Sequence, residues 1–390
     1  MAERRRPLSD RPERSDRDGR VRVLQLIKSL GRGGAEVLLL ETLRAGDRER
    51  FDYRFGYFLP HKDALAGALA REGAEVTCFP ARSSAAIPLR VPALARYLRR
   101  SGIDLVHCHL SLAGVAGRLA GRLAGVPVVY TEHGPIEYLE APSRLLNLWT
   151  WPLQERVIAV SEEVAASVRR HAGERVPLVV IENGVSSAHF APDPARGREL
   201  RARLGIPPGA PVVGTVAVFR PQKRLADWLR VASALRARHP DLRLLVVGDG
   251  PERDAVATLA GELGLAEAVV FAGLQADVRP FLDAMDLYLM TSGFEGLPIA
   301  LLEAMAMALP IVSTAVGGIV DAVDDSCGAL AAVGDLPALA AAAGALLADP
   351  ERRRALGDGA RRRVEERFSM ARMVARIEAL YREVLERRRR

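Results

Sequence analysis

The chain has 390 residues, 49% hydrophobic and 26% charged, which is enough to bury the cores of about two or three domains. Lys and Arg number 55 and Asp and Glu 48, so the formal charge is +7, and most of it lies at the two ends. A nucleic-acid groove needs basic residues gathered on a folded face, so we expect no nucleic-acid partner. Three cysteines without a Cys-x-x-Cys spacing favour a reducing, cytoplasmic location.

The two ends of the chain are polar. Residues 1–20 are charged and without periodicity, which predicts a disordered tail, and residues 387–390 are all arginine. Such basic ends either aid solubility or draw a protein to an anionic membrane surface. The longest apolar run, 337–348, is about half of the roughly 20 residues that a membrane span needs. Any membrane contact is therefore expected to be peripheral.

From Val21 onward, short β-rich runs alternate with longer helical stretches. The runs at 21–27 and 53–59 are each followed by a helical pattern, from about Ala35 and about Asp63. Five further strands follow, with the sequences EVTCF, DLVHCH, VVYT, VIAV and LVVI. Such alternation is typical of a parallel sheet covered by helices.

A passage rich in Pro, Asp and Gly, at 191–211, is predicted to be a loop, after which the alternation restarts. The later strands are expected at 212–218, 243–248, 269–273, 287–290 and 310–314. The sequence thus predicts two doubly wound domains, 21–190 and 191–368, and a last helix over 369–390 that would cross back to the first domain. Ligands bind beyond the carboxyl ends of such strands, so two facing sheets would form a cleft.

A glycine-rich turn, KSLGRGGAE at 28–36, follows the first strand and leads into a helix, an arrangement that favours a phosphate group. It departs from the dinucleotide fingerprint G-x-G-x-x-G, because Glu36 stands where the third glycine is needed. The same test fails when it starts from Gly248, since Arg253 stands at the third position. A plain tight turn is the alternative for 28–36.

Two further segments offer charged side chains. Arg220 and Lys223, in FRPQK at 219–223, follow the first strand of the second domain and suit a diphosphate, although a solvated loop has the same composition. Glu295 lies in a loop, and Pro298 suits the first turn of the next helix. Glu303 interrupts the apolar side of that helix, so it either faces a cleft and binds ligand hydroxyls or pairs with an internal arginine.

Three histidines lie at the ends of predicted strands in the first domain. Strand alternation places His107 and His109 on one face, but two ligands do not make a metal site, so packing or cleft lining is the stronger interpretation. His133, in the segment TEHG at 131–134, ends a strand where the cleft should open.

Together these motifs resemble the retaining GT-B glycosyltransferases of glycosyltransferase family 4, also called group 1, over about 21–385. Glu295 and Glu303 match the family's E-x7-E element. The resemblance implies an α/β GT-B fold of two Rossmann-like domains that face a cleft, with the acceptor side at 21–190 and the nucleotide-sugar side at 191–368. The other matching segments are GGAE (33–36), TEHG (131–134), IENGV (181–185), FRPQK (219–223) and VVGDGPER (246–253).

The resemblance also implies roles for single residues. Glu303 would bind the ribose hydroxyls of the donor, and Glu295 would bind hydroxyls of the transferred sugar. Lys223 and Arg220 would neutralise the diphosphate, and His133 would contact the sugar from the first domain. Backbone amides around Gly296 and Leu297 would help to neutralise the diphosphate, and Gly33 and Gly34 would border the phosphate and the acceptor side. The loop near Gly273 would contact the base, and Gly248 would also belong to the donor-binding residues.

The chain departs from the family pattern at three positions. Val218 stands where an arginine is common, which bears on phosphate binding, and Ser186 and Asp321 replace a common Asp and a common Glu. The single D-x-D motif, at 16–18, lies in the tail, so we expect no metal ion and no other cofactor. The resemblance then implies front-side displacement with retention, in which the leaving phosphate takes the acceptor's proton.

The expected donor is a UDP-sugar or a GDP-sugar, and the expected acceptor is a glycan or lipid-linked molecule of the cell envelope, at the inner face of the membrane. Residues 145–151, LLNLWTW, either contact that membrane or pack inside the first domain. Two other functions stay open. They are another GT-B activity, such as an epimerase or a phosphorylase, and a non-catalytic sugar-nucleotide binding subunit, which Val218 would suit.

Overall fold

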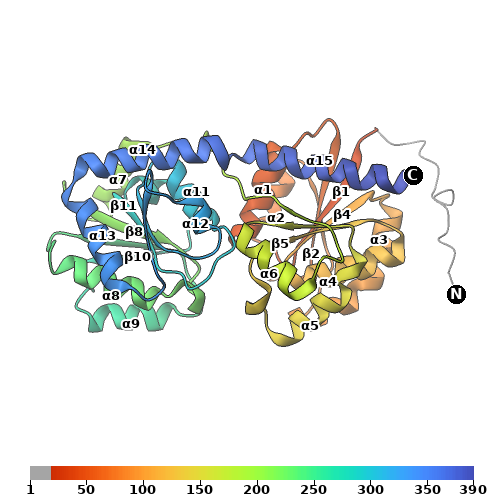
Figure 1. Ribbon diagram of the computed structural model, residues 1–390, viewed down its shortest axis with the longest axis horizontal. Coiled ribbons are helices and arrows are strands. Elements are labelled where there is room, and N and C mark those ends of the chain that lie inside the picture. The colour runs from red at the N-terminus through yellow and green to blue at the C-terminus, as the bar shows by residue number, and fades with distance from the viewer. Residues whose placement is uncertain (1–18) are drawn as a thin grey trace.

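The computed structural model describes residues 19–390, so the tail expected to be disordered falls almost wholly outside the described residues. Two lobes lie side by side in Figure 1, and each contains a sheet with helices on both faces. The first sheet has seven strands in the order β3-β2-β1-β4-β5-β6-β7, and the second has six in the order β10-β9-β8-β11-β12-β13. All of the neighbouring strands pair in parallel, as the alternation of strand and helix predicted.

The first sheet has a buried centre and partly exposed edge strands, β3 and β7. Its strands are β1 (Val21–Leu26), β2 (Phe51–Tyr57), β3 (Glu75–Cys78), β4 (Leu105–His109), β5 (Val128–Glu132), β6 (Arg156–Ala159) and β7 (Leu178–Val180). One face packs on α1 (Gly34–Ala45), α2 (Ala66–Arg71) and α15 (Met370–Arg389). The other face packs on α3 (Val91–Arg100), α4 (Ser111–Ala124), α5 (Ala141–Thr150) and α6 (Glu162–Ala172), with the short helices η2 (Ser84–Arg90), η3 (Ile136–Tyr138) and η4 (Trp151–Leu153).

The second sheet contains β8 (Val212–Val216), β9 (Arg243–Val247), β10 (Val269–Gly273), β11 (Leu287–Met290), β12 (Ile311–Thr314) and β13 (Gly328–Ala331). One face packs on α8 (Leu225–Arg236), α9 (Arg253–Glu262) and α13 (Leu336–Ala348). The other packs on α7 (Pro194–Arg203), α10 (Arg279–Asp283), α11 (Ile299–Ala306), α12 (Ile319–Ala322) and α14 (Pro350–Arg367). The short helix η5 (Pro221–Lys223) follows β8.

The structure corrects three expectations. The segment 191–211, predicted as a loop, contains α7, because the Asp193 side chain accepts hydrogen bonds from the first backbone N–H groups and Pro194 suits the first helical turn. The helix expected from about Asp63 begins at Ala66. Pro298 precedes α11 as its N-cap, in an extended conformation, instead of lying in its first turn.

The last helix, α15, runs from the second lobe across the first, as the blue helix along the top of Figure 1 shows. Its Tyr381 is fully buried among core residues of the first domain, and Glu378 accepts a hydrogen bond from the Tyr53 hydroxyl at 2.6 Å. The chain therefore closes by anchoring its carboxyl end on the domain in which it starts. Within residues 19–390, no helix is long and apolar enough to cross a membrane.

Candidate functional site

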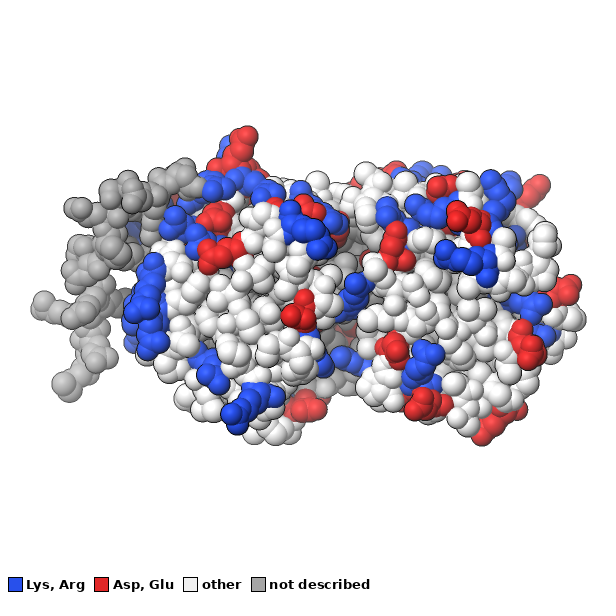
Figure 2. Space-filling model, turned by 180° about the vertical axis from the view of Figure 1, so that it is seen from behind, with Lys and Arg blue, Asp and Glu red and all other residues white. Residues whose placement is uncertain are grey.

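The carboxyl ends of the two sheets meet, and loops from both domains touch there. The Asn183 amide donates a hydrogen bond to the Leu297 carbonyl at 2.8 Å. A Cβ atom placed on Gly296 would lie 2.1 Å from the carbonyl oxygen of His133, so only glycine permits this approach. The fold therefore brings the predicted sugar-binding residues of both domains together. Figure 2 shows the hollow between the lobes from behind, with basic side chains beside it.

Lys223 and Glu295 form an ion pair in this region, with Lys223 Nζ 2.5 Å from Glu295 Oε1. Lys223 ends η5 after β8, and Glu295 lies in the loop after β11, the neighbouring strand. Arg220 precedes η5 and is exposed. Burial, and then the charge of Arg220, lower the pKa of Lys28 at the end of β1. Cations from both domains thus converge beside the predicted diphosphate position.

Glu303, on α11, is only 7% exposed. Among the described residues it has no ion-pair partner, so the internal pairing with an arginine is wrong. Burial raises the pKa of Glu303 to about 7, and the carboxylates of Glu41 and Asp277 add to the rise. A buried carboxylate without a partner is costly unless a ligand supplies hydrogen bonds.

The glycine turn before α1 is covered by a side chain that sequence reasoning did not select. A Cβ atom on Gly33 would lie 2.5 Å from Glu36 Oε2, and the Ser29 hydroxyl donates to Glu36 Oε1 at 3.3 Å. Burial raises the pKa of Glu36. Gly34 packs against Ile299 of the second domain. The turn therefore presents a carboxylate to the cleft, beside its backbone N–H groups.

Gly248 and Gly273 lie side by side where β9 and β10 end. The Gly248 N–H donates to the Gly273 carbonyl at 2.9 Å. The φ of Gly248 is +124°, and a Cβ atom there would lie 1.9 Å from the carbonyl oxygen of Ala217, so this position requires glycine. The loops after β8, β9 and β10 consequently pack closely against one another.

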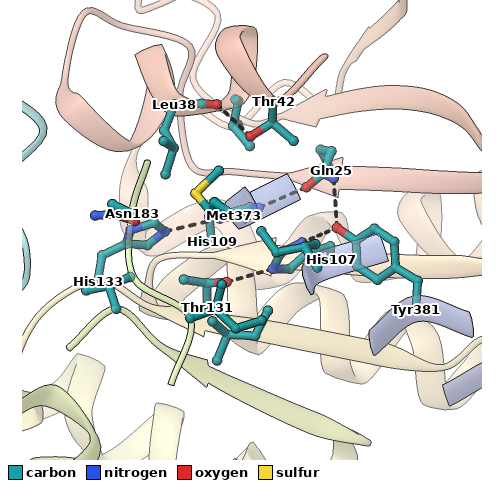
Figure 3. A pocket seen from close by; sticks show the side chains of 15 residues that line it. Gln25, Leu38, Thr42, His107, His109, Thr131, His133, Asn183, Met373 and Tyr381 are labelled. Carbon is teal, nitrogen blue, oxygen red and sulfur yellow. Dashed lines mark hydrogen bonds between the residues drawn. The ribbon is translucent and has the colours of Figure 1, made fainter. Parts of the chain in front are cut away.

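A cavity in the first domain is lined by the three histidines, together with Gln25 of β1 and Tyr381 of α15 (Figure 3). The rings of His107 and His109 lie 4.2 Å apart between centroids, on one face of β4 as predicted. Burial lowers the pKa of His107 to about 3 and that of His133 to about 4. Over residues 19–390, no group of three or more His, Cys, Asp or Glu side chains is arranged to hold a metal ion.

The three departures from the family pattern lie apart. Val218 is half-buried in the loop before Arg220. Ser186 accepts a hydrogen bond from the backbone N–H of His189 at 3.3 Å. Asp321 lies in α12, and its carbonyl accepts hydrogen bonds from Arg363 and Arg367 of α14. Val218 is thus the departure that lies in the same loop as the predicted phosphate ligands.

Comparison with known proteins assigns both halves of the chain. Residues 19–189 match the model described as Glycosyltransferase Family 4, and residues 197–363 match the model described as Glycosyl transferases group 1. N-acetyl-alpha-D-glucosaminyl L-malate synthase of Bacillus anthracis is 30% identical over 75% of this chain and 78% of its own length. The 2-deoxystreptamine N-acetyl-D-glucosaminyltransferase of Streptomyces fradiae is 31% identical over 86% of this chain and 83% of its own length.

Solved structures show the same fold. HepE of Anabaena in complex with UDP-glucose superposes with a TM-score of 0.84, at 23% identity, over 93% of this chain and 99% of HepE. The sucrose-phosphate synthase of Thermosynechococcus elongatus superposes with a TM-score of 0.79 over 94% of this chain and 100% of its own. These likenesses confirm the predicted GT-B arrangement of two α/β domains.

Proposed function

The chain belongs to the group 1 glycosyltransferases of glycosyltransferase family 4, and we propose that it moves a hexose from a UDP-sugar or GDP-sugar to an acceptor with retention of configuration. The donor site is supported above all by Glu303, a buried carboxylate with no hydrogen-bond or ion-pair partner for its side chain within residues 19–390. Two neighbouring ribose hydroxyls supply the hydrogen bonds that this carboxylate lacks.

The ion pair of Lys223 and Glu295 suits a diphosphate sugar, with its cation toward the diphosphate and its carboxylate toward the sugar. Lys223 stabilises the negative charge that develops on the leaving phosphate, and Glu295 accepts hydrogen bonds from sugar hydroxyls. Arg220, two positions beyond Val218, adds a second cation. In this mechanism, the leaving phosphate accepts the proton of the acceptor hydroxyl as the new glycosidic bond forms and the sugar–phosphate bond breaks.

Titration with a panel of UDP-sugars and GDP-sugars, followed by thermal unfolding, identifies the donor. NMR of the product then reports the anomeric configuration, and inversion would contradict the mechanism. Slow hydrolysis of the bound donor separates an enzyme from a binding subunit, since a binding subunit leaves the donor intact. Conversion of the donor without an acceptor, or only with inorganic phosphate, would instead indicate an epimerase or a phosphorylase.

The reaction is proposed to need no divalent metal ion, because Lys223 and Arg220 are proposed to neutralise the diphosphate. Turnover should survive an excess of EDTA. Complete loss that added Mg²⁺ or Mn²⁺ restores would contradict this part of the proposal.

A lipid-linked or glycan acceptor of the cell envelope, reached from the cytoplasmic face of the membrane, is part of the same proposal. Its support is the exposed side of α5, where Leu145 is 69% and Trp149 is 72% exposed. Trp151, at the end of the same segment, packs inside the domain, as the alternative predicted. The neighbouring helices are basic, since residues 76–131 contain seven Arg and one Asp. The exposed cations there, none of them in an ion pair with a described residue, are Arg82, Arg96, Arg99, Arg100 and Arg122.

Co-sedimentation with vesicles tests this surface. Anionic vesicles should retain the protein better than neutral ones, because clustered arginines near an anionic surface gain about 1 kcal/mol each. The double variant Leu145→Ser with Trp149→Ser should weaken retention at least about tenfold, since both side chains lose apolar burial in the lipid. Leu274→Ser, at an exposed leucine of the second domain, is the matched control. Equal recovery from anionic and neutral lipid would exclude electrostatic attachment.

A further inference from the structure

Six polar side chains form an unbroken line of hydrogen bonds inside the first domain, and it ends at the cleft (Figure 3). The line joins β1, β4 and the end of β5 to α15, so it connects the cleft to the last helix of the chain. In order from the cleft, its members are His133, His109, Gln25, Tyr381, His107 and Thr131.

The amide of Gln25 sets the direction of the half of the line nearest the cleft. Gln25 Oε1 lies 2.9 Å from His109 Nε2, and a carbonyl oxygen can only accept, so His109 carries its proton on Nε2. A neutral imidazole has one proton, which leaves His109 Nδ1 as an acceptor. The ring of His133, with Nε2 3.1 Å from that atom, must therefore donate from Nε2.

The other half of the line has the same direction. Gln25 Nε2 donates to the Tyr381 hydroxyl at 3.0 Å, so the hydroxyl proton is free to point away from Gln25. It points to His107 Nδ1, 2.5 Å away, and His107 Nε2 in turn donates to the Thr131 hydroxyl at 2.7 Å. Five hydrogen bonds thus run one way, and each neutral ring holds its proton on Nε2.

The buried environment keeps the imidazole rings of His107, His109 and His133 neutral. Burial lowers the pKa of His107 to about 3 and of His133 to about 4, and it lowers that of His109 well below the usual value. At neutral pH, none of the three rings takes up a second proton, so the direction of the line decides which nitrogen of each ring is protonated.

His133 is the member of the line that reaches the cleft. Its carbonyl borders Gly296 of the second domain, its ring is half-buried, and Nδ1 forms no hydrogen bond within the described part of the chain. We propose that Gln25 and Tyr381 are positioning residues that hold His133 in its Nε2–H tautomer, so that the bare Nδ1 accepts a hydrogen bond from a hydroxyl of the donor's sugar. The sugar as ligand rests on the proposed function, whereas the tautomer does not.

Nitrogen NMR of the ligand-free protein, labelled with ¹⁵N in its histidine rings, tests the tautomer directly. We expect the His133 signals of a neutral ring protonated at Nε2, assigned by their loss in His133→Asn. A ring protonated at Nδ1, or a mixture of both forms, would overturn the proposal. Because no donor is present, this result is independent of whether the chain transfers a sugar.

Tyr381→Phe tests the positioning role, and Tyr53→Phe is the matched control. Both variants remove a buried hydroxyl that forms a hydrogen bond between α15 and the sheet. The Tyr53 hydroxyl bonds to Glu378, however, and is not a member of the line. Without the Tyr381 hydroxyl, the Gln25 amide is no longer linked to His107 and can turn over on its own, so both tautomers of His133 should appear. The KM for the donor should rise about 2- to 10-fold, as for one lost neutral hydrogen bond.

Two outcomes would overturn the positioning role. One is an unchanged tautomer and KM in Tyr381→Phe, and the other is an equal change in Tyr53→Phe. If Tyr381→Phe does not fold, Gln25→Met, which removes both amide contacts at similar length, takes its place with the same expected result. If Tyr381→Phe shows mixed His133 tautomers while the wild type shows one tautomer but binds no donor, the positioning role stays intact and the proposed function is refuted.

Discussion

Lys223 Nζ lies 2.5 Å from Glu295 Oε1, so a residue expected at the diphosphate and a residue expected at the sugar are direct partners. The side chain of Glu295 is only 7% exposed and that of Lys223 only 16%. The pair links the loops that follow two neighbouring strands, β8 and β11. Substitution of either residue is therefore expected to affect catalysis and also to leave the other charged side chain buried without its ion-pair partner.

Lys223→Ala should lower turnover about 100- to 1,000-fold, the usual cost of removing one preorganised donor to a developing oxyanion. It should also lower the free energy of unfolding by about 1–3 kcal/mol, because Glu295 stays buried without its partner. Steady-state kinetics and urea unfolding measure the two effects. Arg238→Ala, at an exposed cation of the same domain, should change neither. Normal turnover in Lys223→Ala would place the diphosphate elsewhere.

Glu303→Gln should weaken donor binding by about 1.5–3 kcal/mol, the range for a hydrogen bond to a charged group, and leave the fold intact. The amide keeps the shape of the side chain but loses the charge and one acceptor. Isothermal titration with the donor measures the change, and Glu262→Gln, at an exposed carboxylate, is the control. Unchanged affinity would reassign Glu303 to a structural role.

The same variant should change how stability depends on pH. The folded pKa of Glu303 is raised to about 7, so ionisation costs the folded state more than the unfolded one. The contribution of this group to stability therefore falls as pH rises from about 4.5 to about 7 and then levels, a loss of about 3 kcal/mol in total. Glu303→Gln has no carboxyl group to ionise at this position. Its free energy of unfolding in urea, relative to that of the wild type, should therefore rise between pH 5 and pH 8.

Arg220→Ala should reduce turnover severely, because Val218 stands where the family's arginine is common and leaves Arg220 and Lys223 as the two cations proposed at the diphosphate. Introducing Val218→Arg into the Arg220→Ala background should restore part of the rate, since position 218 lies in the same loop. Kinetics at saturating donor measure both. A rate in Arg220→Ala close to that of the wild type would show that Arg220 is only a solvated surface residue.

Acid should destabilise the protein through its buried histidines. In the folded protein, the pKa values of His107, His109 and His133 lie below the ordinary 6.5. Below pH 6.5, the unfolded chain therefore binds more protons at these histidines than the folded chain does. The contribution of these histidines to the free energy of unfolding is fully present above pH 6.5. It falls as pH drops toward 4, by about 1.4 kcal/mol per pH unit for each histidine. Urea unfolding at pH 6 and pH 5 measures how steeply the free energy of unfolding falls with pH. His107→Gln should reduce this slope by the contribution of one histidine, about 1.4 kcal/mol per pH unit. The exposed His61→Gln should leave it unchanged.

The positions of most core strands along the chain followed from local patterns. The run predicted at 287–290 coincides with β11, and the run at 310–314 contains β12, because a buried parallel strand is an apolar run between turn residues. Two elements escaped these patterns. In α7 only Gly197 and Leu200 are buried, so its sequence shows no apolar stripe, and β13 consists of the four residues Gly-Ala-Leu-Ala. Its pairing with β12 makes it a strand.

The sequence by itself determined the doubly wound architecture and the family, and it predicted which charged residues form a donor site, because spacing and residue type along the chain carry these features. Only the tertiary structure decided the partners. It showed that Glu303 has no ion pair among the described residues, that Glu36 covers the glycine turn, and that Gln25 bonds Tyr381 from 356 positions away. Such contacts depend on how the sheets and the returning helix pack in space, and no local pattern encodes a hydrogen bond between the two ends of a chain.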